Sequence, residues 1–137
     1  MKSTIDGLAN LIENELKDWE VNVVHKAVND GLEETAKMAE QELKKGGPYR
    51  ERTGKYTKDW THDERYSRAS AITGLKGYSV YNKKHYQLTH LLEKGHQLKI
   101  GGRVLGNVRA YAHIAPVNEL VGDYAIQKIS RKVGGRV

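Results

Sequence analysis

The residues with the clearest capacity for chemistry lie in the stretch HLLEKGH, at positions 90–96. His90, Glu93 and His96 are three positions apart, and imidazole and carboxylate groups are common zinc ligands. A zinc-peptidase helix, however, spaces its two histidines four positions apart so that both reach one metal. Here the spacing is six, and Gly95 is expected to end the helix before His96. We therefore interpret the stretch as structural, with a metal-dependent hydrolase built on these three residues as an alternative.

Other catalytic patterns do not occur in the sequence. It contains no cysteine, which excludes disulfides, thiolate zinc sites and a cysteine nucleophile. It also lacks a G-x-S-x-G nucleophile elbow and the phosphate-binding G-x-x-x-x-G-K-[ST] loop. His113 lies between apolar neighbours on an expected strand, where a histidine packs more often than it binds a ligand. We predict that the chain is not an enzyme and that it uses no cofactor and no metal.

The composition indicates one small domain with little core. Hydrophobic residues make up 38% of the 137 residues, Phe is missing, and eight Tyr and two Trp carry the aromatic content. Tyr and Trp combine apolar area with a polar tip, so they suit half-buried and partner-facing positions. No signal-peptide pattern and no run of 18 apolar residues occurs. We expect a soluble protein made in the cytoplasm, with surface left over for contacts.

The net charge of +6 is unevenly distributed. Residues 1–43 hold four basic and ten acidic side chains, a net of −6, whereas residues 44–137 hold nineteen basic and seven acidic, a net of +12. This division indicates two faces that meet different surroundings, or copies that stack acidic end to basic end. The alternative is an acidic helix that lies over the basic body of its own chain.

The apolar spacing predicts the order of the elements. Two amphipathic stripes, Ile5–Trp19 and Val24–Leu43, are not in one phase, so we expect a break near 18–21, with a single bent helix as the alternative. Strands are expected over 69–74, 77–82 and about 110–114, with a helix over 84–94. Pro116 is expected as the first residue of a final helix. The predicted buried stripe of that helix is Val117, Val121, Ala125 and Ile129.

These elements predict an α+β fold in a single domain, residues 1–137. It comprises a helical arm (1–45), a basic loop (46–68) whose interior is too charged to be core, and an α+β body (69–133). The body would hold a small, mainly antiparallel sheet of three or four strands, one short helix and a C-terminal helix.

The basic loop carries the strongest surface signal. Its cations are interleaved with Tyr and Trp, a composition that suits nucleic acid, a protein–protein rim or a solvated loop. Further cations follow in the glycine-rich segment 96–110. The subunit-interface or DNA-channel candidates are Arg50, Arg52, Lys55, Tyr56, Lys58, Trp60, Arg65, Arg68, Lys99, Arg103 and Arg109.

From about residue 20 onward, the order of motifs resembles a known family. A P-x-x-x-R-T-G-x-Y-x-x-x-W pattern (48–60) precedes VYNKKHYQLTHLLEKGH (80–96), GGR (101–103) and AHIAPVNE (112–119). This order is similar to the gene-10-like family of long-tailed bacteriophages, small head–tail joining or tail-completion proteins. The matching signature residues are Thr53, Gly54, Tyr81, Asn82, Tyr86, Leu91, Leu92, Glu93, Gly95 and His96.

The resemblance implies a non-enzymatic virion protein of the neck or the head-proximal tail end, present in the host cytoplasm during assembly. Its partners would be other copies in a ring, neighbouring neck and tail proteins, and double-stranded DNA that passes without sequence specificity; no membrane is implied. HLLEKGH would be a structural helix end. Tyr86, Leu88, Leu91 and Leu92 would pack it on the sheet, while Glu93 and His96 fix the departure of the next loop. The alternative function is a basic nucleic-acid-binding module.

Overall fold

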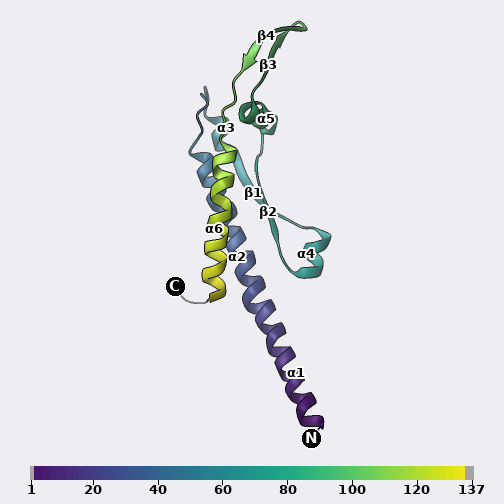
Figure 1. The fold of residues 1–137 in the computed structure, drawn as a ribbon. Coiled ribbons are helices and arrows are strands. Elements are labelled where there is room, and N and C mark those ends of the chain that lie inside the picture. The colour runs from purple at the N-terminus through teal and green to yellow at the C-terminus, as the bar shows by residue number, and fades with distance from the viewer. Residues whose placement is uncertain (1, 135–137) are drawn as a thin grey trace.

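The computed structural model describes residues 2–134 of the chain, and side chains from residue 5 onward. The fold is α+β, as predicted, with a long N-terminal helix, four short strands, a short helix and a C-terminal helix (Figure 1). In chain order the elements are α1 (Lys2–Trp19), η1 (Glu20–His25), α2 (Lys26–Lys44), α3 (Lys55–Lys58), β1 (Trp60–Arg65), α4 (Arg68–Thr73), β2 (Gly77–Asn82), α5 (Tyr86–Lys94), β3 (His96–Ile100), β4 (Arg103–Val108) and α6 (Ile114–Gly134).

The N-terminal region is one continuous helix. The π-helical segment η1 joins α1 to α2, so the chain stays helical from Lys2 to Lys44 and the predicted break at 18–21 was wrong. A π turn holds more residues than an α turn, so it rotates the helix faces after it relative to those before it. The two apolar stripes can therefore be out of phase within a single helix, which was the alternative.

The C-terminal helix α6 runs antiparallel beside α2 (Figure 1). The two backbones approach closely at Gly31, where a Cβ atom would lie 2.5 Å from the Cγ1 atom of Ile129. Lys132 forms an ion pair with Glu34 across this contact, at 3.0 Å. The stripe on α6 that was predicted to be buried is only half-buried along its length, and no residue of this helix is fully buried. The helix begins at Ile114, so Pro116 lies within its first turn, where the missing N–H is not needed.

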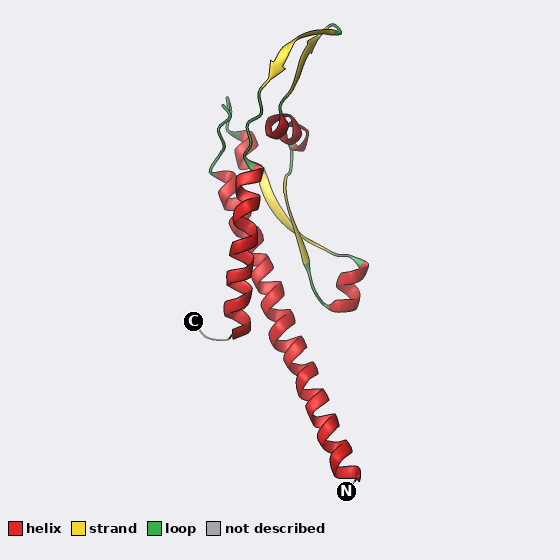
Figure 2. Ribbon diagram, viewed as in Figure 1, coloured by secondary structure: helices red, strands yellow, loops and turns green. Residues whose placement is uncertain are grey.

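The four strands form two separate antiparallel hairpins (Figure 2). β1 pairs with β2 from Trp60↔Asn82 to Arg65↔Gly77, and β3 pairs with β4. The strand predicted over 69–74 was wrong, because these residues mostly form α4. The Ser67 hydroxyl accepts a hydrogen bond from the Ser70 N–H, which caps the start of that helix. Gly74, at φ +73°, ends it.

Strand β1 lies in the segment predicted to be a loop. Its inward positions are mostly polar, which hides the usual apolar alternation, but these positions have partners. His62 binds Glu40 of α2, and Glu64 pairs with Lys76 at 3.1 Å. The strand predicted near 110–114 was also wrong, since residues 109–113 form neither helix nor strand. The neighbouring β3–β4 hairpin instead projects from the body (Figure 2).

Candidate functional site

The centre of the body is an aromatic core supplied mainly by the segment predicted to be too charged for burial. Tyr49, Tyr56 and Trp60 pack with Leu43 of α2 and are 8%, 6% and 3% exposed. The rings of Tyr56 and Trp60 meet edge to face, with centroids 5.8 Å apart. The prediction that this segment contributes no core was therefore wrong. Tyr56 and Trp60, which were interface or DNA candidates, are enclosed within the chain.

His113 lies inside this aromatic cluster. Its Nε2 atom is 2.8 Å from the Tyr56 hydroxyl, and its Nδ1 atom is 2.9 Å from the Tyr111 carbonyl oxygen. Two partners satisfy both ring nitrogens, so the prediction of a packed histidine is confirmed, although it precedes a helix and does not lie on a strand. Burial raises the pKa of the Tyr56 phenol. The Tyr56 hydroxyl and the His113 ring thus serve as each other's hydrogen-bond partners inside the aromatic cluster.

Glu93 holds the start of α6. Its carboxylate accepts hydrogen bonds from the backbone N–H groups of His113, Ile114 and Ala115, at 2.8, 3.0 and 2.9 Å. These are donors that a helix start leaves without partners, and the next residue, Pro116, has no N–H. Burial alone would raise the pKa of Glu93, but the three backbone bonds lower it below its ordinary value. Glu93 thus caps a helix that begins 21 residues later in the sequence.

The other two polar residues of HLLEKGH face different surroundings. His90 lines a groove formed with α2 and α6, whereas His96 begins β3 and lines a second hollow beside Tyr49 and Arg50. Within residues 2–134 no group of three or more His, Cys, Asp or Glu side chains is placed to hold a metal ion. The Glu93 carboxylate accepts hydrogen bonds from backbone N–H groups at the start of α6. This stretch therefore links α5 to α6 and does not form a metal site.

Asn82 is the most enclosed of the signature residues, at 2% exposure. Its side-chain NH₂ donates to the Tyr56 carbonyl oxygen at 2.7 Å, and its side-chain oxygen accepts from the His85 N–H at 2.9 Å. It therefore joins the end of β2 to both α3 and the start of α5. The neighbouring Tyr81 hydroxyl binds Asp63 across the hairpin.

Two signature glycines have left-handed backbone conformations. Gly54 precedes α3 at φ +72°, and the adjacent Thr53 hydroxyl accepts from the Lys55 N–H. Gly95 ends α5 at φ +73°, where a Cβ atom would lie 2.5 Å from the Val108 carbonyl oxygen. Both positions require glycine for geometric reasons.

The outer face of α5 is more open than predicted. Leu92 packs against the core, but Tyr86, Leu88 and Leu91 are 60%, 43% and 41% exposed. The expectation that all four side chains pack on the sheet was wrong for those three. The reason is positional: α5 lies beyond the Asn82 end of the two-stranded β1–β2 hairpin, so the hairpin does not extend under the helix (Figure 1).

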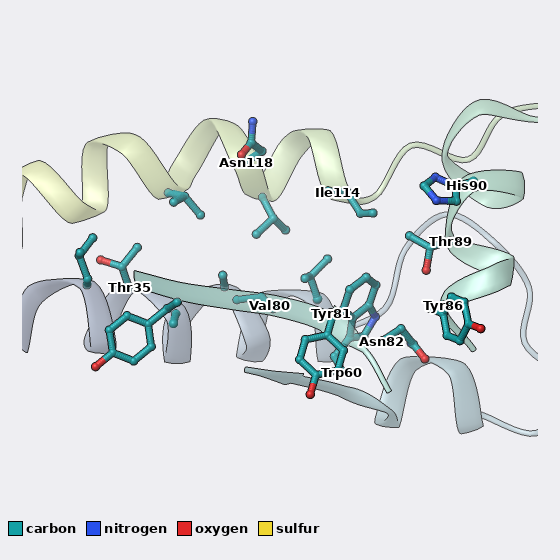
Figure 3. Close-up of a pocket in the computed structure, with 17 residues that line it drawn as sticks. Thr35, Trp60, Val80, Tyr81, Asn82, Tyr86, Thr89, His90, Ile114 and Asn118 are labelled. Atoms are coloured by element: carbon teal, nitrogen blue, oxygen red, sulfur yellow. The ribbon is translucent and has the colours of Figure 1, made fainter. Parts of the chain in front are cut away.

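An apolar groove runs along α2 between α6 and β2, as Figure 3 shows. Its volume is about 440 Å³, and Leu32, Ala36 and Ala39 line it from α2. Val117, Asn118 and Val121 of α6 lie along one side. The hairpin and α5 contribute the remaining lining residues, which include Tyr78, Val80, Tyr81, Tyr86, Thr89 and His90.

The stripe on α1 has no partner within residues 5–134. Its side chains are at least half exposed: Ile5 68%, Leu8 57%, Ile12 52%, Leu16 61% and Trp19 50%. In Figure 1 the helix extends away from the body. Six large apolar side chains, counting Leu11 at 58%, therefore face solvent on one helix.

The nine basic candidates are exposed, but the fold does not gather them into one patch. Arg50, Arg52, Lys55 and Lys58 surround α3, and Arg68 begins α4 at the far end of the β1–β2 hairpin (Figure 1). Arg65 donates to the Ser79 hydroxyl at 2.8 Å. Lys99 and Arg103 lie on the β3–β4 hairpin, and the Arg109 guanidinium lies 5.1 Å from the centre of the Tyr111 ring.

Sequence analysis missed Tyr49 as a core residue and the long-range partner of Glu93. One signal was available in Gly47, the second of the two glycines before Pro48. A Cβ atom there would lie 2.5 Å from the Tyr49 ring and 2.8 Å from the His113 Cβ atom. A glycine pair before Pro48 thus marks a close approach as well as a stop.

No family model matches the chain, and searches of curated proteins and of solved structures found no similar protein. Among residues 2–134, no helix combines the length and apolar character needed to span a membrane.

Proposed function

We propose that this chain is a structural subunit of a phage virion that joins head and tail, as a neck connector or tail-completion protein, and that it assembles as a ring around the DNA channel. The observation that carries the proposal is that one chain has both an uncovered apolar stripe on α1 and, at a distance from it, an open apolar groove on the body. A chain that leaves both surfaces free is suited to burying them against other subunits. The sequence resemblance supplies the kind of assembly.

Three protruding parts would make the contacts. Helix α1, which alone is called the arm from here on, extends from the body, and so do the loop 46–54 and the β3–β4 hairpin (Figure 1). Contacts that fix such segments cost conformational entropy, which weakens pairing between free subunits and favours docking on an existing platform. Assembly would then follow an order set by the neighbouring neck and tail proteins.

The exposed cations support a non-specific role toward DNA. Contacts to phosphates that are numerous, weak and independent of base sequence would let the duplex slide through the ring. Tyr56 and Trp60 of the basic loop are buried and cannot stack on bases, which leaves Tyr66, at 81% exposure, as its one exposed aromatic side chain. This favours the assembly subunit over the alternative nucleic-acid-binding module. Neutralising Lys55, Lys58, Arg65 and Arg68 would test the electrostatic role, since assembly that stays insensitive to salt and to these changes would argue against it.

The deciding experiment is electron microscopy of lysates from a phage that lacks this gene. Filled heads beside separate tails of normal length would support the joining role, and a plasmid copy of the gene should restore joined particles. Normal joined particles without the gene would refute the proposal. Salt-dependent binding of the purified protein to duplex DNA would then favour the alternative module.

A further inference from the structure

The arm and the groove cannot meet within one chain. Since α1, η1 and α2 form one continuous helix, the stripe on α1 lies on the same axis as the groove residues of α2. At about 1.5 Å per residue, Trp19 lies about 20 Å from Leu32 along that axis and Ile5 about 40 Å away. The surface that could cover the groove is therefore held away from it.

The two surfaces match in length and in apolar character. The stripe from Ile5 to Trp19 covers about 21 Å of helix, and the groove along α2, from Leu32 to Leu43, covers about 17 Å. The stripe places apolar side chains at intervals of three and four, the pattern with which a helix anchors in an apolar groove. We propose that α1 of one copy docks its stripe into the groove of a neighbouring copy.

Charge supports this pairing. Helix α1 holds two lysines and four carboxylates, a net of −2, whereas residues 44–137, which supply most of the groove residues, carry a net of +12. Lys83 and Lys84 are exposed and lie between the groove residues Asn82 and Tyr86. The stripe of α1 is flanked by carboxylates, including Glu15 and Asp18, that would face such a basic rim. Pairing of α1 with another acidic α1 would lack this attraction.

An arm in a neighbour's groove is a heterologous contact. Each copy offers an arm to one neighbour and a groove to another, so repetition closes into a ring where the rotation permits. The inference rests on the proposed function in one respect, that the occupant is another copy of this chain. It deepens that function by naming the interface.

Cross-linking of purified full-length protein tests the pairing directly, because the natural chain has no cysteine. Ile12→Cys places a thiol on the stripe and Asn118→Cys places one at the groove; both positions are exposed in the single chain. Mixing the two variants under mild oxidation should give a disulfide-linked heterodimer. Asn14→Cys, on the opposite face of α1, and Glu119→Cys, the exposed neighbour of Asn118, are the matched controls and should cross-link at least tenfold less.

The outcomes separate the inference from the proposed function. Faster cross-linking of Ile12→Cys to itself would show arm–arm pairing and overturn the inference, as would no specific heterodimer at any soluble concentration. A specific heterodimer from a gene whose loss leaves joined particles would keep the interface and reject the head–tail role. A joining defect without the heterodimer would do the reverse.

Discussion

Two regions of this molecule reverse the usual relation between pattern and burial. The arm α1 has the apolar periodicity of a buried helix, yet its stripe is half exposed or more. The segment 46–68 is rich in charge, yet it supplies Tyr49, Tyr56 and Trp60 to the core. Periodicity tells which face of a helix is apolar, but it does not tell whether the covering surface belongs to the same chain.

Part of the segment 46–68 can be buried because its polar groups form hydrogen bonds with other residues of the same chain. Tyr56, Asn82 and His113 are each at least nine-tenths buried and hydrogen-bonded. A buried polar group costs little when its partner is present and a great deal when it is lost. The body therefore depends on a few specific buried polar contacts, whereas the polar contacts of α1, Lys17 with Glu13 and Asp18 with Asn22, lie on its exposed surface.

The sharpest test of this contrast compares the two tryptophans. Trp60→Ala removes a side chain that is 3% exposed, so we expect a loss of about 3–5 kcal/mol in the free energy of unfolding. Trp19→Ala removes one that is 50% exposed and should change it by about 0.5 kcal/mol or less. Urea unfolding of dilute protein, followed by circular dichroism, measures both. Equal losses would contradict the division into arm and core.

The tie between α5 and α6 gives the next largest effect. Glu93→Gln replaces an acceptor of three backbone hydrogen bonds with a group that keeps one oxygen and adds a competing NH₂. Hydrogen bonds to charged groups are worth about 1.5–3 kcal/mol each and are not additive, so we expect a loss of about 3 kcal/mol at pH 7. Glu119→Gln, an exposed change on α6 itself, is the control and should be near neutral.

The same carboxylate predicts a pH dependence. Despite its burial, the backbone bonds lower the pKa of Glu93 below the ordinary 4.5, so its folded form binds a proton less readily than its unfolded form. Its stabilisation is therefore complete above about pH 4.5 and is lost as the pH falls through the lower folded value. Glu40 behaves in the same way: burial would raise its pKa, but hydrogen bonds from Lys44 and His62 lower it. The wild-type curve alone therefore contains contributions from both carboxylates. The difference between the wild-type and Glu93→Gln curves isolates Glu93, and parallel curves would contradict its capping role.

Much of the fold followed from local signals. Glycine stops, the stripes of α2 and α6, and the helix over 84–94 predicted the α+β class and the positions of the major helices. The errors occur where tertiary partners override local pattern. β1 has polar inward residues whose partners lie on other elements, and α4 depends on the Ser67 cap, which was not recognised against a β-like alternation.

The candidate site was predictable only in part. Interpreting HLLEKGH as a structural helix end agrees with the Glu93 geometry, but the donors that Glu93 binds are 20 to 22 residues away, and no spacing rule connects them. The groove requires α2, α6 and β2 to be placed in space before it exists. The exposed cations could be named from the sequence, whereas their distribution over three separate regions could not.

Glycine positions provide a smaller effect on the same junction. Gly95→Ala forces a side chain at φ +73° and places its Cβ atom 2.5 Å from the Val108 carbonyl oxygen, so the backbone must shift. We expect a loss of about 2 kcal/mol in the free energy of unfolding. Gly101→Ala, at φ +56° with no atom within 4 Å, should cost about 1 kcal/mol. Thermal unfolding measures both, and equal losses would mean that the close approach to β4 does not matter.

The smallest expected effect on the free energy of unfolding is that of polar substitutions on α1, and it gives the most direct comparison between the arm and the core. Leu8→Gln and Leu16→Gln together change side chains that are 57% and 61% exposed, so the free energy of unfolding of dilute protein should change by about 0.5 kcal/mol or less. The matched change on α2, Leu43→Gln, places an amide at a position 6% exposed and should cost about 2–4 kcal/mol. Urea unfolding over a series of protein concentrations measures both and separates folding from association. A large loss from the arm variant in dilute protein would mean that the stripe is covered within one chain; a loss that appears only as concentration rises would show that the stripe stabilises contacts between copies.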